Sequence, residues 1–165
     1  MNYFLEEHEY LSIDELISSL KNSLDNHNRV AILALCFIIP DLLSKNMENN
    51  KKENYIKWFD NNIKEHYNYD GEIGSDLINT YGDGKLFYAL RCSFLHAGNT
   101  EIITKNLDLA DIIVEFVYDK DTEFSVGIES YGKIKYDGKT IKKVRLNIEK
   151  MASIFIKSLQ CYERK

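Results

Sequence analysis

Apolar residues recur three and four positions apart in several stretches of the chain, which is the period of an amphipathic α-helix. The first stretch opens with Ser12 and Glu15, a capping-box pair, and predicts a helix over residues 12–26. Residues 29–46 are apolar on nearly every side, which is typical of a buried central helix. Pro40 lies inside this second stretch. Because proline removes a helical hydrogen bond and crowds the preceding turn, we expect a kink or a short break there.

The helical period returns in two later parts of the chain. Residues 51–67 predict a third helix, which follows a polar, low-complexity segment at 46–54 that we interpret as a solvated and disordered loop. A short helical turn is expected over residues 75–81. Asn147 can cap a last helix, because the apolar residues at 148–162 form a single stripe.

Residues 83–97 form the helix around which we expect the rest of the chain to be organised. At about 100° per residue, one set of apolar residues covers an arc of roughly 100°, the width of a core-facing stripe. These residues are Leu86, Phe87, Leu90, Phe94 and Ala97. The opposite half mixes polar groups with residues that prefer burial, so we expect it to contact another part of the fold, a second subunit or a substrate. That half carries Tyr88, Arg91, Cys92, Leu95 and His96. Gly98 predicts the end of the helix near Ala97.

The pattern changes to that of strands in the second half of the chain. Residues 110–118 are rich in β-branched and aromatic residues, and apolar residues alternate with polar ones over 124–128. Residues 133–136 and 139–145 flank Asp137-Gly138, a strong signal for a two-residue hairpin turn. We therefore expect a small antiparallel sheet of three or four strands. It would be an insertion, at about 110–146, between the last two helices of a bundle.

Length and composition favour a single domain over residues 1–165. The predicted elements make its fold class mainly α with a small β part (α+β). The chain has 165 residues, of which 44% are hydrophobic, enough for one sizeable core. The formal net charge is −5, and the isoelectric point is about 5.4. This charge argues against a protein that coats nucleic acid through its overall charge, but it allows a local basic site.

Neither the cysteines nor the N-terminus indicates an extracellular or membrane protein. Cys36, Cys92 and Cys161 are far apart and odd in number, which predicts neither disulfides nor a zinc site. The N-terminal segment is acidic and lacks the apolar core of a secretory signal. The longest apolar run, residues 30–39, is about half the length that a bilayer requires. We expect a soluble cytoplasmic protein that uses no cofactor and no metal. His8, His27 and His66 are interpreted as surface residues.

Arg91 and His96 are the strongest candidates for chemistry. Five residues of helix place them about 140° apart on the half that does not face the core. Arginine offers a permanently charged, forked clamp for phosphate, and histidine can give or take a proton near neutral pH. Cleavage of RNA by the 2′-hydroxyl needs both functions: proton transfer at the attacking or leaving oxygen, and stabilisation of charge at phosphorus.

The segment YALRCSFLHAGN, residues 88–99 with Arg91 and His96, resembles the Arg, four-residue spacer, His signature of HEPN domains. These are all-helical modules that include metal-independent endoribonucleases of toxin–antitoxin, phage-defence and RNA-processing systems. The order of the predicted helices is also similar, so the resemblance covers most of the chain outside the β insertion and implies a HEPN-like antiparallel helical bundle.

The resemblance implies a homodimer in which two motif helices face each other and two Arg–His pairs share one cleft. Arg91 would bind and polarise the scissile phosphate, and His96 would act as general base or acid. Tyr88 and Leu95 would lie at the dimer interface. Active members commonly carry a polar residue directly after the Arg, whereas this chain has Cys92, a weak hydrogen-bonding group. An antitoxin protein is a possible further partner.

Several residues have a structural interpretation beside the functional one. Arg91 and His96 could cap carbonyls or bridge subunits. Cys92 is most simply a small apolar filler. Asp41 either faces solvent after Pro40 or, if buried, needs a partner such as Arg91 or His96.

The predicted hairpin is basic. Its positively charged residues, especially Lys142, Lys143 and Arg145, could contact RNA phosphates. Alternatively, they could protect a solvated strand edge from aggregation. They are Lys133, Lys135, Lys139, Lys142, Lys143 and Arg145.

Three hypotheses follow from these patterns and from the resemblance to HEPN domains. The first is a metal-independent HEPN-like endoribonuclease, a toxin or phage-defence effector in function. The second is a catalytically silent HEPN-like dimer that binds RNA or a protein through the same cleft. The third is a purely structural dimer in which Arg91 pairs with a carboxylate across the interface.

Overall fold

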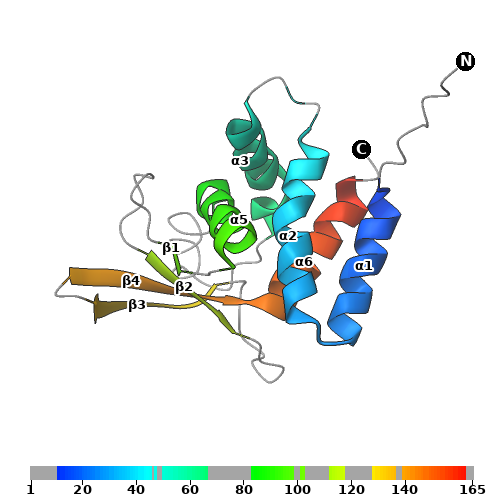
Figure 1. Ribbon diagram of the computed structural model, residues 1–165. Helices are drawn as coiled ribbons and strands as arrows, with labels where there is room; N and C mark the ends of the chain where they lie inside the picture. The colour runs from blue at the N-terminus through cyan, green and yellow to red at the C-terminus, as the bar shows by residue number, and fades with distance from the viewer. Residues whose placement is uncertain are drawn as a thin grey trace, which may run out of the picture.

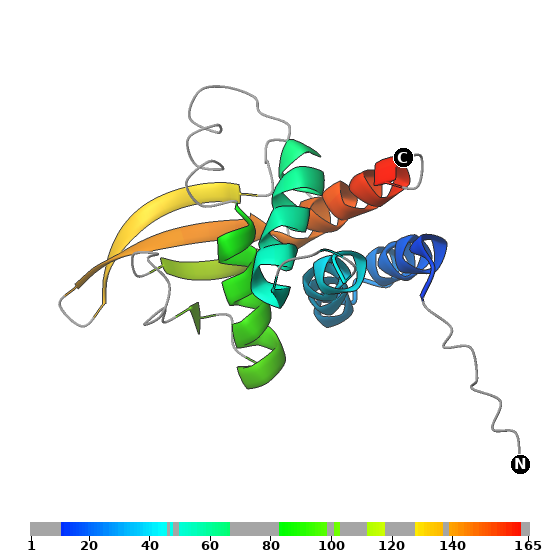
Figure 2. The same ribbon diagram turned by 90° about the horizontal axis from the view of Figure 1, so that it is seen from above.

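The computed structural model describes residues 11–45, 47, 50–66, 83–98, 101–102, 112–117, 128–136 and 139–162. In these parts the chain forms helices that pack together and a sheet that extends to one side of them (Figures 1 and 2). The helices are α1 (Ile13–Asp25), α2 (Arg29–Leu43), α3 (Lys51–Asn62), the 3-10 helix η1 (Lys64–His66), α5 (Gly84–Ala97) and α6 (Ile148–Tyr162). The strands are β1 (Glu101–Ile102), β2 (Ile112–Val117), β3 (Ile128–Tyr136) and β4 (Lys139–Asn147). The mainly helical character expected from the sequence is confirmed.

Polar side chains begin the helices where the sequence predicts them. At α1 the capping box is complete, because the Ser12 N–H donates to Glu15 Oε2 at 2.7 Å and the Glu15 N–H donates to Ser12 Oγ at 3.2 Å. At α6 the side-chain oxygen of Asn147 accepts from the N–H of Lys150 at 3.1 Å. Each cap satisfies a backbone donor that the first turn of a helix leaves without a partner. Both predicted starts are therefore confirmed.

Helix α2 continues through Pro40 to Leu43, so of the kink or short break expected at this proline, the break is not present. Proline removes only one N–H from the helix, and Ile39 and Pro40 are themselves buried. The carbonyl of Pro40 accepts from the N–H of Ser44 at 3.0 Å, so helical hydrogen bonding continues beyond the proline. Burial of the surrounding turns outweighs the loss of a single hydrogen bond.

Helix α3 begins at the predicted residue, Lys51, but ends earlier than predicted. Asn50 caps the helix by accepting from the N–H of Glu53, so residues 51–54 are helical rather than part of the polar loop. The helix ends at Asn62 and is followed by η1, which is earlier than the predicted end at 67. The short helix expected at 75–81 and the alternating residues 124 and 126 lie outside the described residues.

The core is formed where α2, α3, α5 and α6 meet. Phe59 of α3 lies at its centre, with its ring centroid 4.2 Å from that of Phe87 on α5 and 6.1 Å from that of Phe155 on α6. Phe37 of α2 packs edge-on against Phe87 at 6.2 Å. All four aromatic residues are fully buried, and Leu20 brings α1 into the same cluster. Burial of this apolar surface is the main force that holds the helices together.

The sheet has the strand order β1-β2-β4-β3 and is mixed. β3 and β4 form the predicted antiparallel hairpin, although its turn residues lie outside the described residues. β2, however, runs parallel to β4, so the prediction of a wholly antiparallel sheet is wrong. Because both strands run toward the helices, Phe116 and Leu146 are paired at the end of the sheet nearest the core. The strands also begin at Glu101, before the predicted start near 110.

One face of the sheet packs against the helices. Val114 and Leu146 are buried, and the ring of Phe116 lies 6.1 Å from that of Phe37 in α2. Residues directly opposite in neighbouring strands share a face, and faces alternate along each strand. Val114, Phe116 and Leu146 therefore define what we call the helix-facing face, and the other side is the outer face. The hairpin β3–β4 extends beyond the helices (Figures 1 and 2).

Candidate functional site

Helix α5 is held firmly at its N-terminus. Asp83 caps it by accepting from the N–H of Leu86 at 3.0 Å, and Asp60 of α3 accepts from the N–H of Gly84 at 2.7 Å. A Cβ atom on Gly84 would lie 2.6 Å from the carbonyl oxygen of Ile56, so only glycine permits this close approach of α3 and α5. These contacts set the position of the helix that carries Arg91 and His96.

The predicted division of α5 into two faces is present. Leu86, Phe87 and Leu90 are buried in the core, and Phe94 packs against Phe37 with 5.5 Å between ring centroids. On the opposite half Tyr88, Arg91 and Cys92 are half-buried, whereas Leu95 and His96 are exposed. Gly98 ends the helix with a φ of 60° and donates its N–H to the carbonyl of Phe94 at 3.1 Å. The C-terminal turn with His96 is therefore the accessible part of α5.

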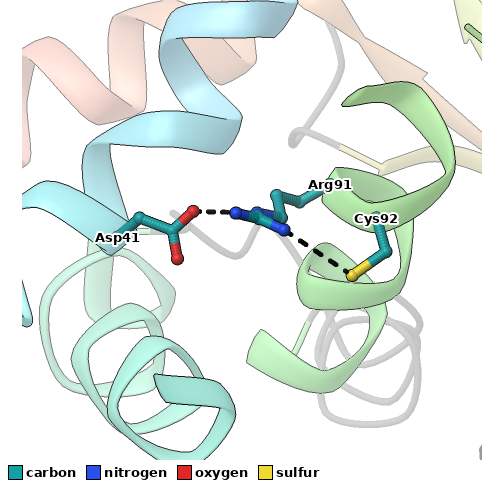
Figure 3. Close-up of polar contacts among 3 residues, drawn as sticks. All are labelled: Asp41, Arg91 and Cys92. Atoms are coloured by element: carbon teal, nitrogen blue, oxygen red, sulfur yellow. Dashed lines mark hydrogen bonds and ion pairs between the residues drawn. The ribbon is translucent and has the colours of Figure 1, made fainter. Parts of the chain in front are cut away.

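Arg91 forms an ion pair with Asp41, so Arg91 is the partner that the half-buried Asp41 carboxylate needs. The Arg91 Nε donates to Asp41 Oδ2 at 2.8 Å, and the two side chains are 24% and 27% exposed. Figure 3 shows Asp41 on α2 and Arg91 on α5 pointing toward each other, with Cys92 beside them. The pairing lies within one chain, so the carboxylate that Arg91 meets here does not come from across an interface as the purely structural dimer hypothesis supposed.

The geometry of this ion pair leaves one edge of Arg91 available. Asp41 contacts the guanidinium through Nε, and Nη1 lies 4.0 Å from Cys92 Sγ, a weak contact. Among the residues that the structure describes, Asp41 supplies the single oxygen that Arg91 contacts. Partial burial disfavours the charged guanidinium, but the hydrogen bond and the charge of Asp41 outweigh it and raise the pKa of Arg91. The ion pair therefore fixes the position of the Arg91 guanidinium and leaves its other N–H donors available for a ligand.

Two tyrosines lie beside the ion pair. Tyr55 of α3 is fully buried and packs edge-on against Tyr88, with 5.3 Å between ring centroids. The Tyr55 hydroxyl has no hydrogen-bond partner among the described residues, and its pKa is raised by burial and by the charge of Asp41. Burial and the neighbouring Cys92 raise the pKa of Tyr88 as well. Nothing in the local sequence of α3 indicates that the Tyr55 hydroxyl lies near Asp41, so sequence patterns could not find this contact.

His96 is separate from this cluster. It lies five residues after Arg91, which corresponds to about 7.5 Å along the helix axis. It is exposed, and no hydrogen bond joins it to Arg91, although both are described residues. One chain therefore supplies an oriented guanidinium, from Arg91, and an accessible imidazole, from His96, at two separate positions along one helix. A phosphodiester that contacts both would have to lie along the outer half of α5.

The other predicted site residues have different surroundings. Cys92 is half-buried rather than a fully buried filler, and Leu95 is 38% exposed. Lys142, Lys143 and Arg145 lie on β4, which is separated from β1 by β2. In the described parts of the chain, no three His, Cys, Asp or Glu residues are grouped so that they could hold a metal ion. Of the predicted set, the structure brings together Asp41, Arg91 and Cys92.

Comparison with protein-family models, with curated proteins and with solved structures found no match. Among the described residues, no helix is both long and apolar enough to span a membrane.

Proposed function

We propose that the protein is a metal-independent endoribonuclease of the HEPN type, in which Arg91 and His96 act on the scissile phosphodiester. The observation that carries this proposal is the arrangement of α5. Asp41 holds Arg91 through Nε and leaves its Nη edge for a phosphate, while His96 is accessible in the last turn of the same helix.

In the proposed reaction the 2′-hydroxyl of the RNA attacks the adjacent phosphorus. The new O2′–P bond forms as the P–O5′ bond breaks, which leaves a 2′,3′-cyclic phosphate and a 5′-hydroxyl. A base takes the proton of the 2′-hydroxyl, an acid delivers a proton to O5′, and Arg91 stabilises the charge on the phosphoryl oxygens. One chain provides one such histidine, His96. A homodimer would provide two, one for each proton transfer.

Asp41 acts in this proposal as a positioning residue. An unpaired arginine side chain samples many rotamers, and an ion pair through Nε orients its remaining donors before a phosphate binds. The rings of Tyr55 and Tyr88 pack edge-on against each other beside this pair.

The test is cleavage of RNA by the purified protein in the presence of EDTA. We expect His96→Ala and Arg91→Ala each to reduce cleavage by about 10²-fold or more, because general acid–base catalysis and charge stabilisation are typically of that size. Asp41→Asn should give a smaller loss. Lys85→Ala is the control, because Lys85 is an exposed residue on the same helix. Cleavage that is absent from the wild type, or unchanged in both variants, would contradict the proposal.

The second candidate is a catalytically silent dimer that binds RNA or a protein through the same helix. It is favoured by Cys92, which follows Arg91 where active enzymes of the resembled family commonly have a polar residue, and which offers Arg91 only a weak contact at 4.0 Å. Retained RNA binding without turnover would identify this function.

A further inference from the structure

The hydroxyl of Tyr55 on α3 is buried without a partner. Tyr55 is fully buried, and no hydrogen bond joins its Oη to any other residue that the structure describes. A buried hydroxyl in this situation costs stability, because it gives up hydrogen bonds to water and receives none in exchange. Phenylalanine would fill almost the same space without that cost. The hydroxyl therefore calls for a role that packing of the ring does not supply.

Tyr55 lies beside the turns of α2 and α5 that carry the ion pair. Each two of the helices α2, α3 and α5 are in contact. The Tyr55 ring packs against that of Tyr88 at 5.3 Å, and Tyr88 precedes Arg91 by three residues, so the two are neighbours on one face of α5. The next residue back from Tyr55, Asn54, donates to the carbonyl of Met47 at 3.1 Å. This bond fixes the start of α3 beside the C-terminal end of α2.

Asp41, in the last turn of α2, has one carboxylate oxygen to offer. Arg91 Nε donates to Oδ2, and in the described part of the chain no donor reaches Oδ1. The charge of Asp41 raises the pKa of Tyr55, so the carboxylate and the hydroxyl are close enough to interact. A phenol is a good donor, and its bond to a charged acceptor is stronger than one between neutral groups. A donor and an acceptor oxygen without bonds therefore lie in one small region.

A phosphate on Arg91 would change the surroundings of Asp41. The Nη edge of Arg91 is the part that is available for an anion, and Asp41 holds the same guanidinium through Nε. A phosphodiester there brings a second negative charge close to the carboxylate. Like charges a few ångströms apart in a partly buried setting repel each other, whereas a hydrogen bond to the charged carboxylate stabilises it. An additional donor to Asp41 would therefore offset the repulsion.

We propose that Tyr55 is a second positioning residue: when a phosphate of RNA engages the Nη edge of Arg91, the Tyr55 hydroxyl donates to Asp41 and keeps its carboxylate on Nε. Only hydrogen bonds rearrange in this step, and no proton is transferred. Tyr55 does not touch the RNA, because its side chain is fully buried. The choice of RNA as the source of the phosphate rests on the proposed function.

The experiment removes single oxygen atoms. Tyr55→Phe deletes the hydroxyl and keeps the ring that packs against Tyr88. It is made with Asp41 present and again with Asp41→Ala, all in a His96→Ala background so that the RNA stays intact. Binding of a fluorescently labelled single-stranded RNA is measured by anisotropy, and stability is measured by chemical denaturation.

Tyr162→Phe is the matched control. Tyr162 is a half-buried tyrosine on α6, and its ring packs against Trp58 at 5.8 Å. The substitution deletes the same atom from a tyrosine that contacts neither α2 nor α5 through its ring partner. It should bind RNA like its parent.

We expect Tyr55→Phe to be at least as stable as its parent, because the hydroxyl has no hydrogen bond to lose. The same variant should bind RNA about tenfold more weakly, which is the size of a hydrogen bond to a charged group. When Asp41→Ala has removed the acceptor, adding Tyr55→Phe should change binding by less than about twofold. A purely structural role of the hydroxyl would give the opposite result, a loss of stability without this coupling.

Two outcomes would overturn the inference. Equal weakening by Tyr55→Phe with and without Asp41 would show that the hydroxyl does not act through the carboxylate. A loss of stability with unchanged RNA binding would show that the hydroxyl is a structural group, bonded to a buried water.

The result is separable from the proposed catalysis. If the protein with His96 binds RNA with the expected dependence on Tyr55 but never cleaves it, this inference stands and the endoribonuclease proposal fails. If it cleaves RNA and Tyr55→Phe alters neither binding nor cleavage, the reverse holds. A protein that binds no RNA would contradict both.

Discussion

The two ends of α5 show opposite packing. At the N-terminal end Gly84 lies against the backbone of Ile56, its N–H is bonded to Asp60, and Phe87 is fully buried. At the C-terminal end Leu95 and His96 are exposed, and a Cβ atom on Gly98 would have open space around it. The tightly packed end fixes the helix in the bundle, and the open end presents side chains to a partner. Stability and the candidate chemistry therefore depend on different halves of one helix.

Gly84→Ala should have the largest effect on stability. Its added methyl group would lie 2.6 Å from the Ile56 carbonyl oxygen and 2.8 Å from the Ile56 Cα, both backbone atoms, so α3 and α5 would have to separate. Overpacking of this kind costs about 1–3 kcal/mol, which outweighs the better helix propensity of alanine. Chemical denaturation measures the loss. A variant as stable as the wild type would show that the close contact of the two helices is not needed.

Gly98→Ala should destabilise the protein less, and for a different reason. Gly98 has a φ of 60° with no atom within 4 Å of an added Cβ, so the cost is backbone strain alone, about 1 kcal/mol. Gly98→Asn, which tolerates this conformation better, should recover part of the loss. The same denaturation experiment compares the two. If Gly98→Ala were more destabilising than Gly84→Ala, the contrast between the ends of α5 would be wrong.

Leu95→Glu tests whether the open end meets a second chain. Leu95 is 38% exposed, so the substitution should change the free energy of unfolding by no more than about 0.5 kcal/mol. In the proposed homodimer it would place a carboxylate in the interface, and the mass in solution should fall from two chains to one. Light scattering coupled to size exclusion measures this mass. Ser93→Glu is a less exposed control on the same helix. A wild type that is already monomeric would contradict facing motif helices.

Asp60→Asn tests the tightly packed N-terminal end of α5 through the pH dependence of the free energy of unfolding. Burial raises the pKa of Asp60, although the N–H of Gly84 and nearby lysines oppose the shift. The folded protein therefore binds the proton more tightly than the unfolded chain, whose Asp pKa is about 3.9. The contribution of this group to stability is complete below that value and is lost as the pH rises through the raised pKa. We expect the stability of Asp60→Asn relative to the wild type to increase over this acidic range and then level off. A flat difference would contradict the raised pKa.

Local patterns were sufficient for most of the helical part. Ser12 with Glu15, Asn147 and Gly98 mark helix ends because a cap bonds to backbone groups only a few residues away. The two faces of α5 followed from its period alone. The continuation of α2 through Pro40 did not, since it depends on how deeply the neighbouring turns are buried.

Contacts between distant segments could not be read from such patterns. Asp41 and Arg91 are 50 residues apart, and whether they meet depends on the packing of α2 against α5. Whether the Tyr55 hydroxyl lies near Asp41 depends in the same way on the packing of α3 against α2.

The sequence by itself determined most of the helices, the helix ends marked by Ser12, Asn147 and Gly98, the β3–β4 hairpin, and the placement of Arg91 and His96 on the half of α5 that faces away from the core. Each of these is set by interactions within a few residues or by a repeat along one element. Only the tertiary structure decided that Asp41 pairs with Arg91 and that β2 runs parallel to β4. These features depend on the relative position of whole elements, because shifting a strand by one residue or turning a helix slightly would change every such pair without altering any local pattern.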